Sequence, residues 1–176
     1  MQAARAEELP GIVVLEQAPI IIEKILIGAT EEQMFWKPSM ERWSIREVMG
    51  HLADVEISGF RQRVQMMVER DAPFLESYDQ NASYAAGKYS NEKPREYLKQ
   101  FCHERDRSLS FLRYIPATAA SRTGMHAEHG KTTVGELMNE WAFHDLGHIR
   151  QIAELLRSRA FYPRMGAFQK YYKISP

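Results

Sequence analysis

The chain has 176 residues, of which 44% are apolar and 26% are charged, as is ordinary for a globular protein able to bury a core. Its 23 basic residues balance its 23 acidic ones, so no bulk charge draws it toward nucleic acid or an anionic membrane. We therefore expect one domain over residues 1–176, with neither nucleic acid nor a membrane as its partner.

The cysteine content and the apolar stretches indicate where in the cell the protein is found. Cys102 is the one cysteine, which excludes an intrachain disulfide framework and any multi-cysteine zinc site. The opening MQAARAEELPG lacks the basic and apolar regions of a signal peptide, and the most apolar stretch, APIIIEKILIGA, is too short to span a bilayer. These features predict a soluble protein of the reducing cytoplasm.

Two helices are predicted in the first half of the chain. The first covers about residues 17–28, with Pro19 tolerated in its opening turn. The second begins at a capping box, in which Ser44 and Glu47 satisfy each other's backbone donors, and continues to about Arg70. Its apolar residues recur at helical spacing; they are Ile45, Val48, Leu52 and Val55.

A long polar and aromatic connection over about residues 71–93 follows, with a short helical turn expected near residues 82–87. Connections of this length are often functional or mobile. A third helix is predicted from Pro94 to just before Pro116, since proline cannot continue a helix.

A second polar segment leads to the fourth predicted helix, which begins at the capping box of Thr133 and Glu136 and ends near Arg159. Only residues 160–168 suggest a short strand. Four long helices with connections of unequal length predict an all-α, antiparallel four-helix bundle with a long connection between helices 2 and 3.

The fourth helix contains the stretch WAFHDLGHIRQI, with His144 and His148 four residues apart on one face. Both fall where core residues belong, in a seam with Val134, Leu137, Trp141, Ile152 and Leu155. Two buried imidazoles need partners, and metal coordination is one way to satisfy both. Hydrogen bonding to other core groups is the alternative.

The HDLGH segment differs from the HExxH pattern of zinc proteases. Asp145 is one methylene shorter than the glutamate that serves there as general base, and no third ligand follows downstream. The protease interpretation is therefore excluded.

A third imidazole is available upstream. His51 borders the apolar seam of the second helix, so packing of this helix against the fourth would bring it beside the pair. Three imidazoles leave a coordination position open, as in catalytic zinc sites. The alternative for His51 is a boundary residue that reaches solvent. His126 and His129 are expected to be solvated, and Cys102, which His103 follows, to be an inert core residue.

The segments FWKPSMERWSIREVMGHLADVE and TTVGELMNEWAFHDLGHIRQI resemble those of the DinB-like superfamily, in the subset with the YfiT-type proposed metal-dependent hydrolases. The resemblance implies a four-helix bundle that holds a divalent metal through His51, His144 and His148. It implies zinc or nickel as the metal, without choosing between them.

The resemblance also implies two reactions. One is metal-dependent S-transfer, with a low-molecular-weight thiol such as bacillithiol or mycothiol and a small electrophile as partners; the other is hydrolysis. The alternative is a non-catalytic, stress-associated metal-binding bundle that acts through a partner or as a homodimer. In that alternative Glu140 or Cys102 supplies a further ligand. A third option has no metal.

Several neighbours of the histidines have structural and functional interpretations side by side. Packing at the entry to the second helix is expected for Trp36, Pro38 and Trp43. The carboxylates of Asp54, Glu56 and Glu140 are expected either to orient an imidazole through a hydrogen bond or to be solvated. Either the rim of the metal pocket or a lid over the core is expected for Tyr78, Asp79 and Tyr84.

Overall fold

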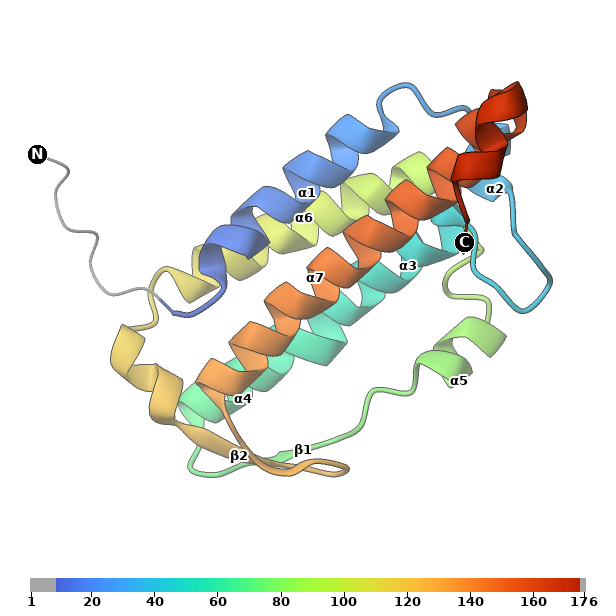
Figure 1. Ribbon diagram of the computed structural model, residues 1–176. Coiled ribbons are helices and arrows are strands. Elements are labelled where there is room, and N and C mark those ends of the chain that lie inside the picture. Colours follow the sequence, from blue (N-terminus) through green and yellow to red (C-terminus); the bar gives the residue numbers. More distant parts are fainter. Residues whose placement is uncertain (1–8, 175–176) are drawn as a thin grey trace, which may run out of the picture.

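The computed structural model describes residues 9–174 and shows four long helices side by side (Figure 1). They are α1 (Ile12–Leu26), α3 (Ile45–Val55) with its continuation α4 (Gln62–Glu69), α6 (Pro94–Leu112) and α7 (Val134–Leu156). Helix α1 packs against α6 and α7, and α3 packs against the same two helices. The predicted all-α four-helix bundle is confirmed.

The direction of the helices explains the long connection. Helices α3 and α7 are antiparallel, and so are α1 and α6, whereas α3 runs parallel to α6 and α1 runs parallel to α7 (Figure 1). A parallel neighbour requires the chain to return along the length of the bundle before the next helix begins. Residues 71–93 make this return, and they include the short helix α5 (Gln80–Ala85).

The helix starts follow the local sequence. The predicted capping boxes at Ser44 with Glu47 and at Thr133 with Glu136 are both present. Thr30 forms a third with Gln33, before α2 (Glu31–Phe35).

Helix α1 begins earlier than expected, at Ile12, after Gly11 in the left-handed conformation. It therefore keeps Pro19 in its interior. Ile12 and Leu15 are buried, and this burial extends the helix.

The second predicted helix has the expected extent but is interrupted by a π-helical segment, Glu56–Arg61, between α3 and α4. Gly59 fits this segment, because a Cβ there would lie 2.3 Å from Cγ2 of Val55. The π turn changes which side chains face the core. Glu56, the first residue of this segment, lies four residues after buried Leu52 and is only 1% exposed.

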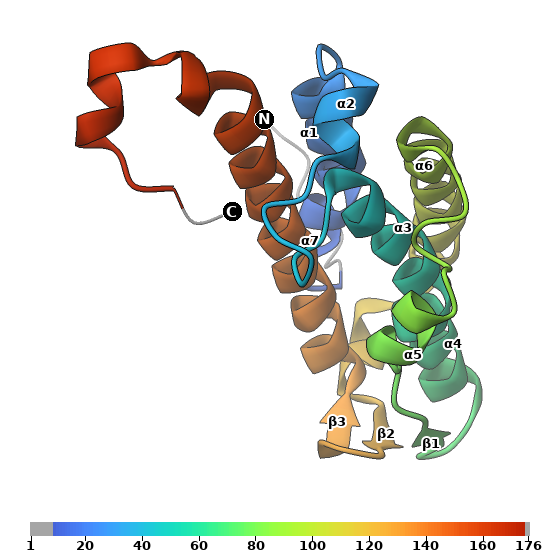
Figure 2. The same ribbon diagram turned by 90° about the vertical axis from the view of Figure 1, so that its right-hand side faces the viewer.

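The polar segments also form a small sheet, which the sequence did not predict. Its strands are β1 (Phe74–Leu75), β2 (Thr123–His126) and β3 (Gly130–Thr133), with β1 parallel and β3 antiparallel to β2. The sheet lies at the end of the bundle where α7 begins (Figure 2).

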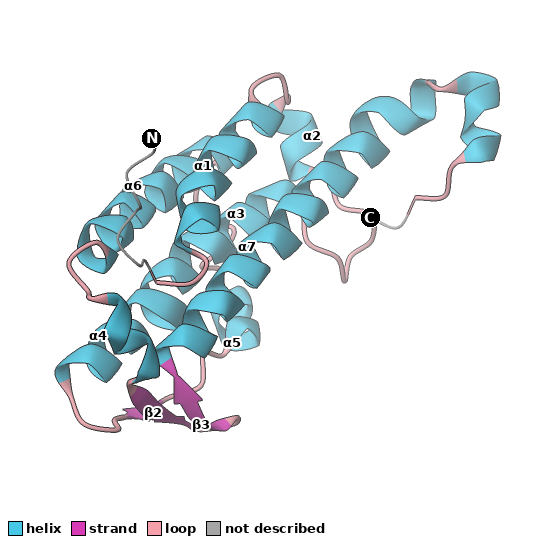
Figure 3. Cartoon of the chain, turned by 60° about the vertical axis from the view of Figure 1, so that its left-hand side comes forward, coloured by secondary structure: helices cyan, strands magenta, loops and turns pink. Residues whose placement is uncertain are grey.

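The strand suggested at residues 160–168 is wrong. This region forms a π turn, Arg157–Phe161, and two 3-10 turns, Tyr162–Arg164 and Gly166–Tyr171. The turns make up an arm that projects from the end of α7 (Figure 3). No neighbouring strand is available there to pair with, and a lone strand leaves its backbone groups unpaired.

The core consists of two apolar clusters along the bundle. The first includes Leu15, Phe60 and Trp141, and the second includes Ile22, Phe101 and Ile152. Polar residues occupy the layer between them on α3, α6 and α7. Within the described residues, no helix is both long enough and apolar enough to cross a membrane.

Candidate metal centre

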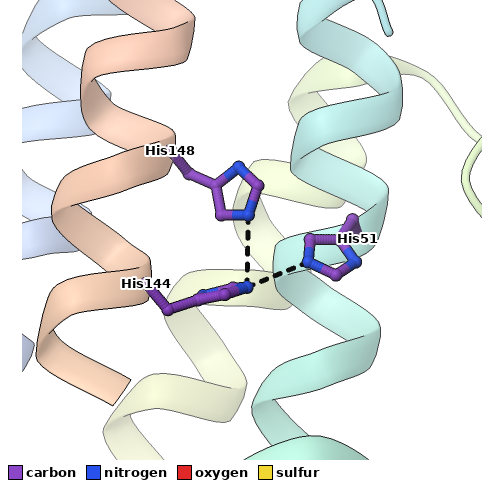
Figure 4. Close-up of side chains that lie close together, drawn as sticks. All are labelled: His51, His144 and His148. Atoms are coloured by element: carbon purple, nitrogen blue, oxygen red, sulfur yellow. Dashed lines mark hydrogen bonds between the residues drawn. The ribbon is translucent and has the colours of Figure 1, made fainter. Parts of the chain in front are cut away.

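The three predicted histidines meet between α3 and α7 (Figure 4). Nε2 of His51 lies 3.0 Å from Nε2 of His144, which lies 3.2 Å from Nε2 of His148. All three nitrogens lie within 4.8 Å of one another. The antiparallel packing of α3 on α7 therefore assembles the set from residues 93 positions apart.

These nitrogens suit a divalent ion. Three nitrogens bound to one zinc at about 2.0–2.1 Å with tetrahedral angles lie about 3.3 Å apart, within a few tenths of an ångström of the two observed separations. Among the described residues, neither Glu140 nor Cys102 belongs to this group. Three protein donors leave room for water or substrate, as in catalytic rather than structural sites.

The lowered pKa values of two of the imidazoles also favour the binding of a metal cation. Burial, together with the charges of His148 and His144, lowers the pKa of His51 from 6.5 to about 2. Burial and the charge of His144 lower the pKa of His148 to about 4. Both rings are therefore neutral at pH 7, which is the form that binds a metal.

A chain of hydroxyl groups orients His51. Nδ1 of His51 lies 3.3 Å from the hydroxyl of Tyr89, which lies 2.6 Å from the hydroxyl of Tyr78, and Tyr78 donates to Oδ2 of Asp54 over 2.6 Å. Because Tyr78 uses its proton on Asp54, Tyr89 must donate to Tyr78. Its oxygen is then left to accept from Nδ1–H of His51. This order leaves Nε2 of His51 unprotonated and free to bind a metal.

Gly50 lets this chain form. A Cβ at Gly50 would lie 2.6 Å from Cα of Tyr89, so the glycine allows residues 71–93 to pack directly on α3. Tyr89 is completely buried as a result. Tyr89 was not among the predicted site residues, although the glycine of the MGH triplet, beside a candidate ligand, was a signal of close packing.

The other two ligands have different surroundings. Nδ1 of His148 lies 2.9 Å from Oε1 of Gln151 on the next turn of α7. Nδ1 of His144 is buried and forms no hydrogen bond of acceptable geometry within the described residues, although it interacts electrostatically with Asp145.

Asp145 and Glu56 both pair with a buried cation. Arg105 on α6 pairs with Glu56 over 2.7 Å and with Asp145 over 2.6 Å, and also donates to the carbonyl of Leu15 over 2.8 Å. Trp141 donates to Glu56 over 3.1 Å. Asp145 is therefore a structural partner of Arg105, and the predicted role of Glu56 in orienting an imidazole is not supported.

Arg105 was not among the predicted site residues. It is completely buried, and the two carboxylates raise its pKa although burial alone would lower it. The available signal was an arginine at a core position of the third helix, between Phe101 and Leu109.

The aromatic residues before α3 do more than pack at its entry. The ring of Trp43 lies 5.1 Å from the ring of His51 and stacks on Tyr84 at 5.9 Å. The hydroxyl of Tyr84 in turn contacts Glu47 and Lys37. Asp79 instead caps α5.

A second group of ligand-type residues lies in the β2–β3 hairpin and consists of His126, Glu128 and His129. His126 is only 8% exposed, so the expectation that it is solvated is wrong. Its Nδ1 accepts from the backbone of Glu128 over 3.2 Å, and its ring stacks on that of His129 at 4.6 Å. Nδ1 of His126 is thus already used by this hydrogen bond, and Glu128 and His129 are exposed.

Two cavities reach the triad from different sides. One, of about 800 Å³, is lined by His144 and His148, and the other, of about 160 Å³, by His51 and His144. Glu140, an exposed residue one turn before His144, lines both.

Comparison with known proteins identifies the family. The model of the DinB superfamily matches residues 15–152, most of the chain and all three histidines. The chain belongs to the DinB superfamily.

Two relatives and one solved structure are similar to this chain. The chain is 26% identical to "Putative metal-dependent hydrolase OB0782" of Oceanobacillus iheyensis, covering 82% of this chain and 83% of that protein. It is also 26% identical to the uncharacterized protein YuaE of Bacillus subtilis, over 74% of this chain and 87% of that protein. The fold matches YfiT from Bacillus subtilis with a TM-score of 0.75 and 21% identity, over 90% of this chain and 93% of that one. That structure is described as a probable metal-dependent hydrolase with an unusual four-helix bundle topology.

Proposed function

We propose that this protein is a divalent-metal-dependent enzyme for small molecules and that it activates a low-molecular-weight thiol for transfer to a small electrophile. The observation that carries the proposal is the convergence of three imidazole Nε2 atoms beside a cavity of about 800 Å³. A divalent ion such as zinc or nickel supplies Lewis acidity there, which lowers the pKa of a thiol or of water.

The residues around the histidines orient these ligands and bury them. The hydroxyls of Tyr89 and Tyr78 hold His51 in the tautomer that presents Nε2, and Gln151 contacts Nδ1 of His148. His51 is only 2% exposed, so its ring is held inside the bundle. The substrate reaches the triad along the face of α7 that contains His144 and His148.

Hydrolysis is the second candidate, and Glu140 is the observation that favours it. Glu140 lines both cavities and lies one helical turn before His144, so its carboxylate is a candidate general base for water. The relative from Oceanobacillus is described as a "putative" and YfiT as a "probable" metal-dependent hydrolase, which supports this candidate further.

The experiment compares the two reactions on one preparation. Protein purified without nickel-affinity chromatography is loaded with zinc or nickel and assayed for transfer of 2-mercaptoethanol to 1-chloro-2,4-dinitrobenzene and for hydrolysis of p-nitrophenyl acetate. Thiol transfer should require the metal and be lost in His144→Ala. Glu140→Gln should lower hydrolysis by roughly 100-fold or more, while thiol transfer changes little.

The result that overturns the proposal is a metal-loaded protein that catalyses neither reaction above the rate of free metal. That outcome would favour a non-catalytic metal-binding bundle that acts through a partner or as a homodimer. If only the ester is cleaved, and in a Glu140-dependent manner, hydrolysis replaces thiol transfer.

A further inference from the structure

The cavity of about 800 Å³ beside the triad has a basic lining. Four cationic side chains contribute to it, and they are Arg42, Arg150, Arg157 and Lys173. The carboxylates in the lining are Glu140 and Glu154. Since the whole chain has no net charge, this excess of positive charge is a local feature.

The cations come from three separate parts of the chain. Arg42 precedes α3, Arg150 and Arg157 lie on or just after α7, and Lys173 lies in the C-terminal arm. A single solvated helix face would not bring these segments together. Their convergence on one cavity is the observation that points to a ligand.

Three of these cations are available to a ligand. Arg157 pairs with Glu154 over 2.9 Å and donates to the carbonyl of Lys173 over 3.1 Å. Within residues 9–174, by contrast, Arg42, Arg150 and Lys173 have no carboxylate within 4.0 Å of their side-chain nitrogens. Within the described residues, these three side chains are therefore not held in ion pairs, while the lining has four cations against two carboxylates.

The wall next to the triad is open and partly apolar. Gly147 lies between His144 and His148 on α7, and a Cβ there would meet no atom within 4 Å. Phe143, which is 79% exposed, lines the same cavity. A ligand chain thus has room to lie along α7 from the cations to the histidines.

We propose that this cavity binds a small anionic substrate, whose carboxylate or phosphate groups contact Arg42, Arg150 and Lys173 while its reactive group lies at the triad. The placement of the reactive group rests on the proposed function. Recognition of the anion does not, because it uses side chains that need no metal.

Calorimetric titration of the full chain with three probes tests the proposal. Mercaptosuccinate carries a thiol and two carboxylates, 2-mercaptoethanol carries the thiol alone, and succinate carries the carboxylates alone. At low salt, the zinc-loaded protein should bind mercaptosuccinate at least about tenfold more tightly than 2-mercaptoethanol. The preference should shrink as sodium chloride screens the exposed charges.

Charge-reversal variants locate the binding. Arg150→Glu should lower the affinity of the zinc-loaded protein for mercaptosuccinate by about tenfold. It should lower the affinity of the metal-free protein for succinate by about the same factor, whereas the affinity for 2-mercaptoethanol should change by less than about twofold. Arg107→Glu is the matched control, because it makes the same charge change at an exposed position of α6, which packs against α1 and α3. Gly147→Leu should block the binding of mercaptosuccinate but not of zinc, because the leucine side chain would fill the open space beside Gly147.

The outcomes separate the two proposals. Equal affinity for mercaptosuccinate and 2-mercaptoethanol, or equal losses in Arg150→Glu and Arg107→Glu, overturns the anionic pocket. Succinate binding that depends on Arg150, in a protein that catalyses neither reaction, supports the pocket and overturns the proposed function.

Discussion

At the scale of single residues, the hydroxyl of Tyr89 determines which nitrogen of His51 faces the other two imidazoles. The order of donors from His51 through Tyr89 and Tyr78 ends at Asp54, an acceptor. Burial and the neighbouring carboxylate raise the pKa of Tyr78, so this phenol keeps the proton that it donates.

Removal of one hydroxyl tests this chain. Tyr89→Phe should weaken zinc affinity by about 10- to 100-fold with little change in fold, because Nδ1 of His51 loses its acceptor. Competition with a chromophoric chelator measures the change. Tyr84→Phe is the matched control, since the hydroxyl of Tyr84 contacts Lys37 and Glu47 rather than a histidine. Equal losses in the two variants would contradict the assignment.

Glu47 links stability to pH. Burial alone would raise its pKa, but hydrogen bonds from Ser44 and Lys37 and the charge of Lys37 lower it below 4.5. A lowered folded-state pKa contributes stability above pH 4.5, and this stability is lost as the pH falls through the folded value. Glu47→Gln should therefore cost about 1 kcal/mol at pH 7 and almost nothing near pH 3. Urea unfolding at both pH values checks this, and an undiminished difference at pH 3 would exclude charge as the cause.

At the scale of elements, glycines on the two ligand-bearing helices have opposite surroundings. Gly50 on α3 is covered by the backbone of Tyr89, whereas Gly147 on α7 faces open space. The first allows the residue 71–93 connection to pack beside His51, and the second keeps the larger cavity open beside His148.

The same substitution should therefore have opposite effects at these two positions. Gly50→Ala should lower the free energy of unfolding by about 1–3 kcal/mol, because the new methyl group overlaps Tyr89, and it should weaken zinc affinity by displacing that residue. Gly147→Ala should raise the free energy of unfolding by about 0.5–1 kcal/mol, through helix propensity alone. Chemical denaturation of both variants measures the pair. A stable Gly50→Ala variant with unchanged zinc affinity would contradict the close packing.

At the scale of the whole molecule, a polar layer joins the two apolar clusters. Arg105 bonds the π turn after α3, the carbonyl of Leu15 on α1 and Asp145 on α7, so one side chain on α6 connects all four long helices. The triad lies in the same layer, and a metal there would connect α3 to α7.

Metal binding should therefore stabilise the bundle. At a free zinc concentration 100 times its Kd, binding adds about 2.7 kcal/mol. For a chain of this size, that raises Tm by about 5–10 °C. Differential scanning fluorimetry with and without zinc measures the shift, and His51→Ala should abolish it. An equal shift in His51→Ala would place the metal elsewhere.

The sequence by itself determined the features that depend on residues within one or two helical turns of each other. The capping boxes start α3 and α7 where the pattern of Ser44 with Glu47 and Thr133 with Glu136 predicted. Helical spacing likewise placed His144 and His148 on one face, and the apolar seam of the second helix indicated His51 as their partner.

Only the tertiary structure decided the features that join distant parts of the chain. The parallel pairing of α3 with α6, the burial of Arg105 against Glu56 and Asp145, and the contact of Tyr89 with His51 all join residues at least 38 positions apart. Local periodicity reports which face of a helix is apolar, but not which helix covers that face or in which direction it runs. The surroundings that orient the histidines were therefore determined by the packing of the bundle.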